Sequence, residues 1–318
     1  MAYVFLVVSA VCLSIMAVLR KKYCDESGNG VIPVLRFMVL QGVIAAAILA
    51  VYVFIAGKGE AFKTTDLFTM ICVFATAVCT AVTLVICICG VKYGNLTLLI
   101  MFATLGSLVL SCVYGVLFDS ERNGIGVFKI IGFVLTAAIL ALSVPFKRKS
   151  NDESDEAKTE RDARQSAKNK KIYALLCVVI FFTNGVVLVF YSAMTKYRPE
   201  YPAPNFIVLY MAILAAISLI PCIVYAVVKK GNAIPRNDTK LGKQLLLIAA
   251  YSIVAVLSEV SSYNCTSLIP IIVQAPLSFT IEIVLTGVAD YVMFKAVPDK
   301  IQIVQMVLAV ICSVCFVL

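Results

Sequence analysis

The sequence predicts an all-α polytopic membrane protein with ten transmembrane helices arranged as two inverted repeats of five helices. Of the 318 residues, 62% are hydrophobic and only 14% are charged, which is far more apolar than a soluble domain. Apolar runs of about 20 residues, the length that a helix needs to cross hydrocarbon, recur along almost the whole chain. One long polar segment separates five of these runs from the other five.

The apolar runs define the expected spans. The first run is followed by the basic residues "RKK" rather than preceded by them, which favours a retained span over a cleaved signal peptide. The short connections "GVKYGN" and "YNCTS" require antiparallel neighbours. In order, the spans are Ala2–Leu19, Val34–Ala56, Leu67–Cys89, Leu96–Phe118, Ile125–Phe146, Ile172–Met194, Phe206–Val228, Leu241–Tyr263, Leu268–Phe294 and Ile301–Leu318.

The polar segment Lys147–Lys171 carries both signs of charge and has alanine as its only apolar residue. Such a composition predicts a disordered linker. The chain is therefore expected to consist of a first five-helix repeat over 1–146, a charged linker over 147–171 and a second five-helix repeat over 172–318.

The distribution of cations predicts the orientation in the membrane. The odd-numbered loops, which include the linker, hold 20 Lys and Arg residues against 6 in the even-numbered loops. The positive-inside rule then places the linker in the cytoplasm and both termini outside. We expect a multi-pass protein of the cell membrane, of the bacterial inner-membrane type.

Charge and cysteine content exclude several other classes. The net charge of +9 is spread through short loops, so we expect no nucleic-acid partner. The spacings "CICG" and "CSVC" resemble metal or redox motifs, but the chain has no histidine and the loops offer no second cysteine pair. We therefore expect no metal, no cofactor and no disulfide framework.

A polar stripe marks the ninth span. Gln274, Ser278, Glu282, Thr286 and Asp290 recur at every fourth residue, which places them along one side of a helix. A charge near the bilayer centre costs roughly 3 kcal/mol on insertion scales. The stripe is therefore expected to face a cavity or other helices rather than lipid, with Glu282 as the first candidate for binding a substrate or a proton.

The eighth span carries the second candidate, Glu259, on a face with Ser252, Ser262 and Tyr263. If "YNCTS" forms a tight turn, the eighth and ninth helices pack side by side, and both carboxylates can line one cavity. Arg36, just inside the second span, is expected either to extend to the interface or to lie at the cytoplasmic mouth of that cavity.

Milder polarity appears elsewhere. Ser107, Ser111 and Tyr114 follow one another at spacings of three and four on the fourth span, and Asn184 lies on the sixth. Two interpretations stay open for these residues and for the two glutamates. They either bind a solute or form hydrogen bonds between helices, as small polar residues commonly do in membranes.

An internal repeat is indicated at an offset of 170 residues. Tyr3 then aligns with Tyr173, Tyr93 aligns with Tyr263, and the turn "YGNLTLL" lies over "YNCTSLI". Because each unit has an odd number of helices, the second unit must cross the membrane in the opposite sense. Inverted repeats of this kind build many secondary transporters, with the solute site near the midplane.

The chain resembles the drug/metabolite transporter (DMT) superfamily of the EamA type, which has two five-helix units. In that family the fourth helix of each unit often carries a proline and ends at an acidic residue. Pro276 occupies the proline position of the second unit, whereas the first unit has Gly106 there. Asp119 or Glu121 fits the acidic position, and Asp290 fits it loosely; Gly132 matches a fifth-helix glycine. The resemblance implies a secondary transporter of small metabolites and names no substrate.

The sequence thus predicts alternating-access transport of small polar or amphipathic metabolites, with proton coupling through Glu282 or Glu259 and sodium coupling left open. No nucleotide-binding motif G-x-x-x-x-G-K-[ST] is present. The alternatives are a non-transporting assembly or lipid-binding subunit and, with less support because the loops are short, an intramembrane enzyme. The expected partners are a small-molecule substrate and the lipid bilayer, and a homodimer is left open.

Overall fold

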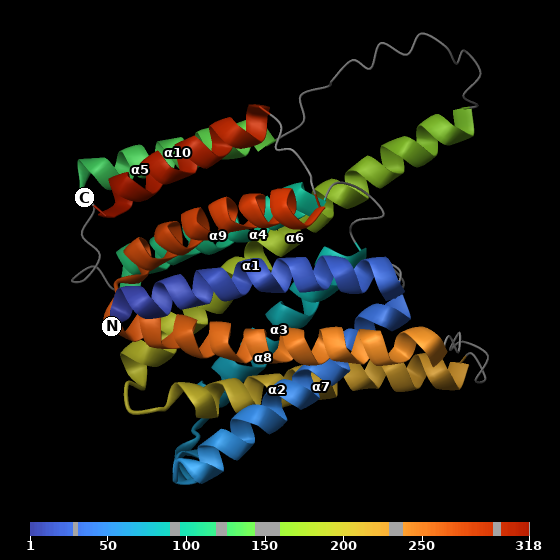
Figure 1. Ribbon diagram of the computed structural model, residues 1–318. Coiled ribbons are helices and arrows are strands. Elements are labelled where there is room, and N and C mark those ends of the chain that lie inside the picture. The colour runs from blue at the N-terminus through green and yellow to red at the C-terminus, as the bar shows by residue number, and fades with distance from the viewer. Residues whose placement is uncertain are drawn as a thin grey trace.

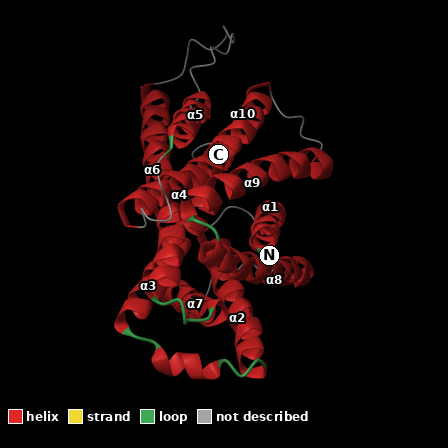
Figure 2. Cartoon of the chain, turned by 90° about the vertical axis from the view of Figure 1, so that its left-hand side faces the viewer, coloured by secondary structure: helices red, strands yellow, loops and turns green. Residues whose placement is uncertain are grey.

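The computed structural model describes residues 1–27, 31–89, 96–118, 126–143, 160–228, 238–294 and 300–317, and all regular structure in these ranges is helical (Figures 1 and 2). The helices are α1 (Ala2–Ser27), α2 (Val31–Ile55), the short 3-10 helix η1 (Gly59–Thr64), α3 (Leu67–Cys89), α4 (Leu96–Phe118), α5 (Val127–Ser143), α6 (Glu160–Tyr197), α7 (Ala203–Val228), α8 (Asp238–Leu268), α9 (Ile271–Phe294) and α10 (Lys300–Val317).

Each of the ten predicted spans falls on one of these α-helices. The predicted bounds of the third and fourth spans coincide with those of α3 and α4. The side chain of Asp66 accepts a 2.9 Å hydrogen bond from the Thr69 N–H, so it caps the first turn of α3 and fixes where that helix begins. Hydropathy therefore located the helices, and local capping chemistry sets their ends.

Helices α1 and α6 extend well beyond their predicted spans, because polar residues continue them. Helix α1 runs on through "RKKYCDES" to Ser27. Helix α6 begins at Glu160, so residues 160–171 are helical where a disordered linker was expected. The segment "ERDARQSAKNKK" contains good helix formers and neither glycine nor proline. The remainder of the predicted linker, 147–159, lies outside the described residues.

The turn between α8 and α9 also differs from the prediction. Residues 263–267, "YNCTS", form the last turns of α8, and the chain reverses at Ile269 and Pro270 instead. The carbonyl of Pro270 accepts hydrogen bonds from the N–H groups of Val273 and Gln274, at 2.9 and 3.0 Å. Proline has no N–H to donate, so it suits the start of a helix and starts α9 here.

The outer surface is that of a membrane-embedded protein. Within the described residues, six helices (α1, α2, α3, α6, α7 and α8) are long and apolar enough to cross a bilayer, and shorter apolar stretches occur in α4, α5 and α9. On α1, the side chains of Tyr3, Val7, Val11 and Ile15 form an exposed stripe at a spacing of four. Large apolar side chains exposed in rows require an apolar surrounding.

Helices whose numbers differ by five have corresponding neighbours in several helix–helix contacts. Helix α1 packs between α8 and α9, and α6 packs between α3 and α4 (Figure 1). Helices α2 and α7 pack on each other, as do α5 and α10. The pairs α1–α8 and α6–α3, α1–α9 and α6–α4, and α2–α8 and α7–α3 correspond when five is added to or subtracted from each helix number. The contact of α6 with α8 has no such counterpart among the stronger helix contacts.

Helix directions follow from residue contacts. Ala2 and Ser9 of α1 contact Cys265 and Ser258 of α8 through hydrogen bonds to their carbonyls, so these helices are antiparallel. Helices α3 and α6 are antiparallel in the same way, because Phe68 packs on Tyr197 and Thr83 bonds Thr183.

Candidate functional site

Arg20 is the cation that reaches the interior of the helix bundle. It lies seven residues before the end of α1, which places its Cα about 10 Å inside that end. Its Nη2 donates a 3.0 Å hydrogen bond to the hydroxyl of Tyr251 on α8, and the guanidinium carbon lies 5.8 Å from the centre of that ring. The Cys87 thiol of α3 lies beside the guanidinium, while the buried Nε has no hydrogen-bond partner.

Glu282 of α9 is turned toward this cation. Its carboxylate interacts electrostatically with Arg20 and with Cys87, which are on α1 and α3, so the side chain faces the bundle interior. No ion pair within 4 Å joins the two charges in the described part of the chain. A cation and an anion therefore face each other without contact at the junction of α1, α8 and α9, which we call the α1–α8–α9 interface.

Glu259 of α8 lies in an aromatic surrounding. Its carboxylate accepts a short hydrogen bond, 2.6 Å, from the Tyr191 hydroxyl of α6. The Tyr210 hydroxyl of α7 lies next to the same carboxylate. The rings of Phe206 and Tyr263 pack on the Tyr191 ring with centroid distances of 5.7 and 5.6 Å. This arrangement can hold an ammonium group by charge and by cation–π contact.

The two carboxylates are not side by side, contrary to the expectation that α8 and α9 pack together. These helices meet only near their connecting turn, and α1 lies between them (Figure 2). Helix α1 packs on both α8 and α9, so it occupies the position in which the two helices of a simple hairpin would contact each other. Glu259 therefore faces Tyr191 of α6 and Tyr210 of α7, whereas Glu282 faces Arg20 of α1. Tyr251 interacts with both Arg20 and Glu259.

The remaining residues of the α9 stripe have separate places. Gln274 is buried; its Nε2 donates a 3.2 Å hydrogen bond to the Ser262 carbonyl, and its Oε1 has no partner. It joins α9 to the end of α8. Ser278 is partly buried one turn before Glu282. The side chains of Thr286 and Asp290 lie outside the described residues.

The polar residues of α4 and α6 are brought together in the α4–α6 interface. Asn184 Nδ2 donates hydrogen bonds of 2.9 Å to the Ala103 carbonyl and to Ser107 Oγ, and Ser107 donates a 3.4 Å hydrogen bond to the Asn184 carbonyl. Ser111 is fully buried, and its hydroxyl has no partner among the described residues. Tyr114 stacks on Phe118 at 5.3 Å. In this interface, Ser107 and Asn184 hold helices together.

Arg36 occupies neither interface. Its charge acts on Tyr23, near the end of α1, and the Tyr23 hydroxyl donates a 2.9 Å hydrogen bond to the Pro33 carbonyl at the start of α2. The residue that sequence reasoning missed is Arg20, which counted as a loop cation. The signal that could have identified it is helical spacing, because Leu13, Met16, Arg20 and Tyr23 follow one another at intervals of three and four.

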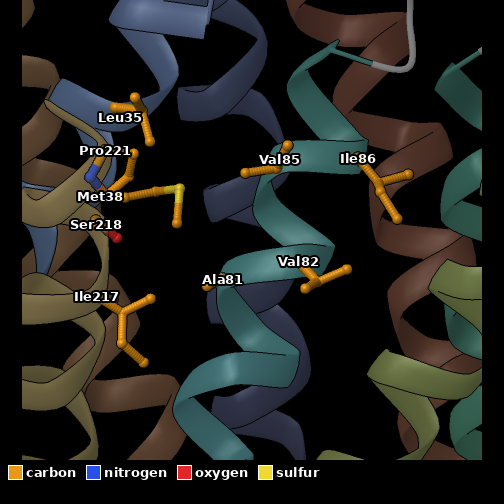
Figure 3. Close-up of a pocket in the computed structure, with 9 residues that line it drawn as sticks. All are labelled: Leu35, Met38, Ala81, Val82, Val85, Ile86, Ile217, Ser218 and Pro221. Carbon is orange, nitrogen blue, oxygen red and sulfur yellow. The ribbon is translucent and has the colours of Figure 1, made fainter. Parts of the chain in front are cut away.

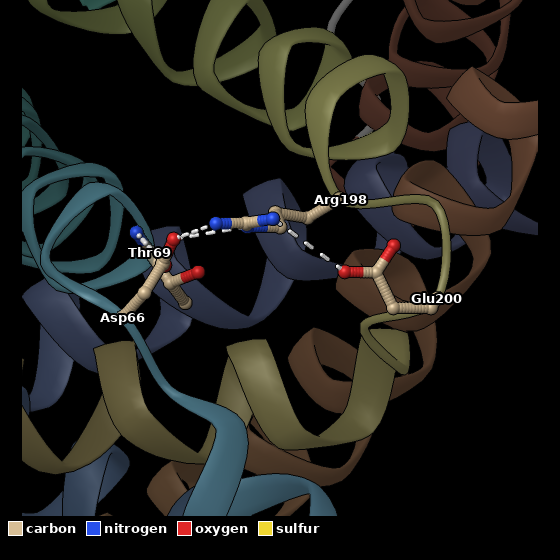
Figure 4. A network of polar contacts seen from close by, with 4 residues as sticks. All are labelled: Asp66, Thr69, Arg198 and Glu200. Atoms are coloured by element: carbon tan, nitrogen blue, oxygen red, sulfur yellow. Dashed lines mark hydrogen bonds and ion pairs between the residues drawn. The ribbon is translucent and has the colours of Figure 1, made fainter.

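Polar contacts also tie the two halves together at one end of the bundle, outside the apolar spans (Figure 4). Arg198, just after α6, donates to Asp66 through Nε at 2.9 Å and through Nη2, and lies 3.9 Å from Glu200. Hydrogen bonds from Thr69 and Arg198 hold the pKa of the Asp66 carboxyl well below its usual range.

The described side chains form neither a metal-binding cluster nor a disulfide bond. No group of three potential ligands among His, Cys, Asp and Glu is positioned to hold a metal ion in that part of the chain. Eleven of the twelve cysteines are free thiols, and the side chain of the twelfth, Cys89, lies outside the described residues.

The fold is shared with solved structures over its whole length. A chain described only as "Crystal structure of protein" superimposes with a TM-score of 0.67 at 14% sequence identity, covering 99% of this chain and 96% of that one; 19 chains of solved structures match in all. At this identity the likeness establishes the fold alone. No family model matches the sequence, and no curated protein matches it.

Proposed function

We propose that the protein is a secondary transporter of small polar or amphipathic metabolites that works by alternating access, as the resemblance to EamA-type transporters implies. In this proposal all ten helices span the cell membrane as two inverted repeats, with the linker in the cytoplasm and both termini outside. The observation that carries it is the α1–α8–α9 interface, where Arg20 of the first half meets Tyr251 and Glu282 of the second.

The helix packing supports the inverted arrangement. Helices five numbers apart have equivalent neighbours, and the antiparallel pair α1–α8 has its counterpart in the antiparallel pair α6–α3. A solute site between such halves can open to either side when one half rocks against the other. Residues from both halves would then contact the solute throughout the cycle.

The carboxylates supply the means of coupling. A charged carboxylate within hydrocarbon is costly unless a proton, a metal cation or a solute amine neutralises it. Glu282 and Glu259 can therefore exchange a bound proton for a solute, and the Tyr191 hydroxyl holds Glu259 in place by its 2.6 Å hydrogen bond. The chain has no histidine, so acidic side chains must carry any proton relay.

Reconstitution tests this proposal. Purified protein in liposomes is screened for uptake of pooled metabolites with and without a pH gradient. We expect uptake by the wild type that the gradient changes, and loss of uptake in Glu282→Gln with folding retained. Exposed Lys63 provides the control variant Lys63→Gln. Undiminished uptake by Glu282→Gln would remove this residue from the mechanism, and absence of any uptake by the wild type would contradict the proposal.

One observation favours a second candidate function, lipid binding. A cavity of about 220 Å³ lies between α2, α3 and α7, with an apolar lining that includes Met38, Val82, Val85 and Ile217 (Figure 3). Pro221 of α7 also lines it. An acyl chain, or the apolar part of an amphipathic solute, fits such a lining.

Lipid retention measured by native mass spectrometry tests the second candidate. Ala81 lines the cavity, so Ala81→Leu should reduce retained lipid, whereas Ala216→Leu, on the exposed side of α7, should not. Equal lipid retention by the two variants would contradict a lipid site in this cavity.

A further inference from the structure

The buried guanidinium of Arg20 has no anionic group in direct contact with it among the described residues. A guanidinium carries five N–H donors, yet its contacts in the described residues are one neutral hydroxyl, one aromatic ring and one thiol. Its Nε is buried without a partner. A cation so placed costs free energy that a direct anionic partner would offset.

No carboxylate among the described residues contacts the Arg20 guanidinium directly. Glu282 acts on Arg20 only through space, and Glu259 is engaged by Tyr191. The levels of Tyr251 and Glu259 differ by eight residues on α8, or about 12 Å along the helix axis. Arg20 and the Glu259 carboxylate therefore lie at different levels along α8, with no ion pair between them among the described residues.

The geometry of the donors selects the ligand chemistry. The fork of Arg20 suits bidentate contact with carboxylate or phosphate oxygens. Tyr251 accepts the hydrogen bond from Arg20, so its hydroxyl has a proton of its own to donate, and no acceptor for that proton is found among the described residues. Arg20 and Tyr251 together can therefore donate to one oxyanion.

We propose that Arg20 and Tyr251 bind an oxyanion, a carboxylate or a phosphate, carried by the transported solute. The inference rests on the proposed transport function and narrows its substrate class to solutes with such a group. A solute that also carries an amine can place it at Glu259, within the rings of Tyr191 and Tyr263. Zwitterionic solutes then fit the interface best.

Binding and uptake are measured separately, so that this inference and the transport function can fail independently. The binding assay follows the thermal unfolding of the full chain in detergent with sodium phosphate, sodium benzoate or uncharged benzamide at equal ionic strength, with sodium chloride as reference. We expect phosphate or benzoate, but not benzamide, to raise the unfolding temperature of the wild type. The rise should vanish in Arg20→Gln, shrink in Arg20→Lys and persist in Lys63→Gln.

The uptake assay uses liposomes and three metabolite pools: solutes bearing an oxyanion, neutral solutes and purely cationic solutes. We expect uptake from the first pool, reduced about tenfold or more in Arg20→Gln, since a charge-assisted hydrogen bond is lost. Arg20→Lys keeps the charge and loses the fork, so it separates binding from folding if Arg20→Gln does not fold. Stabilisation by anions without uptake would support the oxyanion site and contradict transport.

Two outcomes overturn the inference. One is a wild type that neither phosphate nor benzoate stabilises and that takes up only solutes without an oxyanion. The other is oxyanion uptake by folded Arg20→Gln at the wild-type rate.

Discussion

Helices α1 and α6 hold equivalent places in the fold, yet the interfaces around them differ in chemistry. In the α4–α6 interface the helix backbones touch: a Cβ on Gly106 would lie 1.8 Å from the Phe181 carbonyl oxygen, and one on Gly185 would lie 2.3 Å from that of Gly106. There Asn184 and Ser107 bond each other. In the α1–α8–α9 interface, Arg20 bonds Tyr251 and interacts with Glu282 without an ion pair within 4 Å among the described residues, while Glu259 of α8 bonds Tyr191 of α6.

The difference teaches how one packing arrangement can serve two purposes. Where glycines let two helices close, neighbouring polar groups satisfy one another and the interface is structural. Where a buried cation and a carboxylate face each other without an ion pair among the described residues, charges and hydrogen-bonding atoms stay available for a solute. Three variants, each changing one of the two interfaces, test this comparison, and a fourth tests the Asp66–Arg198 contact that joins the two halves at the end of the bundle.

The largest expected effect is on the stability of the α4–α6 interface. Gly106→Ala adds a methyl group where the Phe181 carbonyl lies, so α4 and α6 must separate, and we expect a loss of about 3 kcal/mol or more in the free energy of unfolding. Thermal unfolding and the yield of monodisperse protein measure it. Gly242→Ala on α8 is the matched control, because its Cβ would meet open space. Equal stability of the two variants would contradict the close contact.

The next effect is on transport and leaves stability nearly intact. Glu259→Gln keeps the shape of the side chain and its hydrogen bond with Tyr191, while removing the ability to exchange a proton. We expect solute uptake driven by a pH gradient to fall to background with an unchanged unfolding temperature. Gradient-driven uptake by this variant at the wild-type rate would show that Glu259 only joins α8 to α6.

A smaller effect is expected in the α4–α6 interface, where a variant should lower stability and leave uptake unchanged. Asn184→Ala removes hydrogen bonds to Ala103 and Ser107, which should lower the free energy of unfolding by about 1 kcal/mol. Uptake per folded molecule should stay at the wild-type level, measured in the liposome assay after correction for protein content. A selective loss of uptake at normal stability would place Asn184 in the solute path.

The smallest effect concerns the Asp66–Arg198 contact at the end of the bundle. Hydrogen bonds from Thr69 and Arg198 lower the pKa of Asp66 in the folded state. The carboxylate therefore stabilises the fold above its ordinary pKa of about 3.9, and this contribution is lost as the pH falls toward the folded value. Asp66→Asn should flatten the acid side of a plot of unfolding temperature against pH. An unchanged acid slope would contradict this assignment; the effect is small because both side chains are partly exposed.

Much of the fold could be predicted from the sequence, because hydropathy acts along the chain. The bounds of α3 and α4 and the inward direction of Glu282 follow from apolar runs and a four-residue spacing. The position of α1 between α8 and α9 could not be predicted, because it depends on contacts between residues such as Ser9 and Ser258 that are distant in sequence. Without knowledge of that position, Arg20 in the segment "LRKKY" cannot be distinguished from a loop cation, because two lysines follow it.

The candidate site was predicted in part for the same reason. The sequence identifies costly residues but not their partners, so Glu259 was expected beside Glu282 and lies beside Tyr191 instead. Asn184 and Glu259 are both polar residues inside spans, and only packing shows that the first bonds the backbone and Ser107 of α4 whereas the second bonds Tyr191 among aromatic rings. Gly106 and Gly185 are important because the backbones of α4 and α6 approach each other closely at these residues. The amino-acid sequence alone does not predict that distance.

Two native thiols test the central claim most directly, the claim that the α1–α8–α9 interface opens to water during the cycle and the α4–α6 interface does not. Cys265 of α8, which packs with Leu6 of α1 and donates to the Ala2 carbonyl, is 0% exposed, and Cys177 of α6, which packs with Ala103 of α4, is 4% exposed. Wild-type protein in liposomes is treated with a small water-soluble thiol reagent, and mass spectrometry of its peptides follows each site over time. Faster modification of Cys265 than of Cys177 is predicted; equal rates, or faster modification of Cys177, would contradict the account.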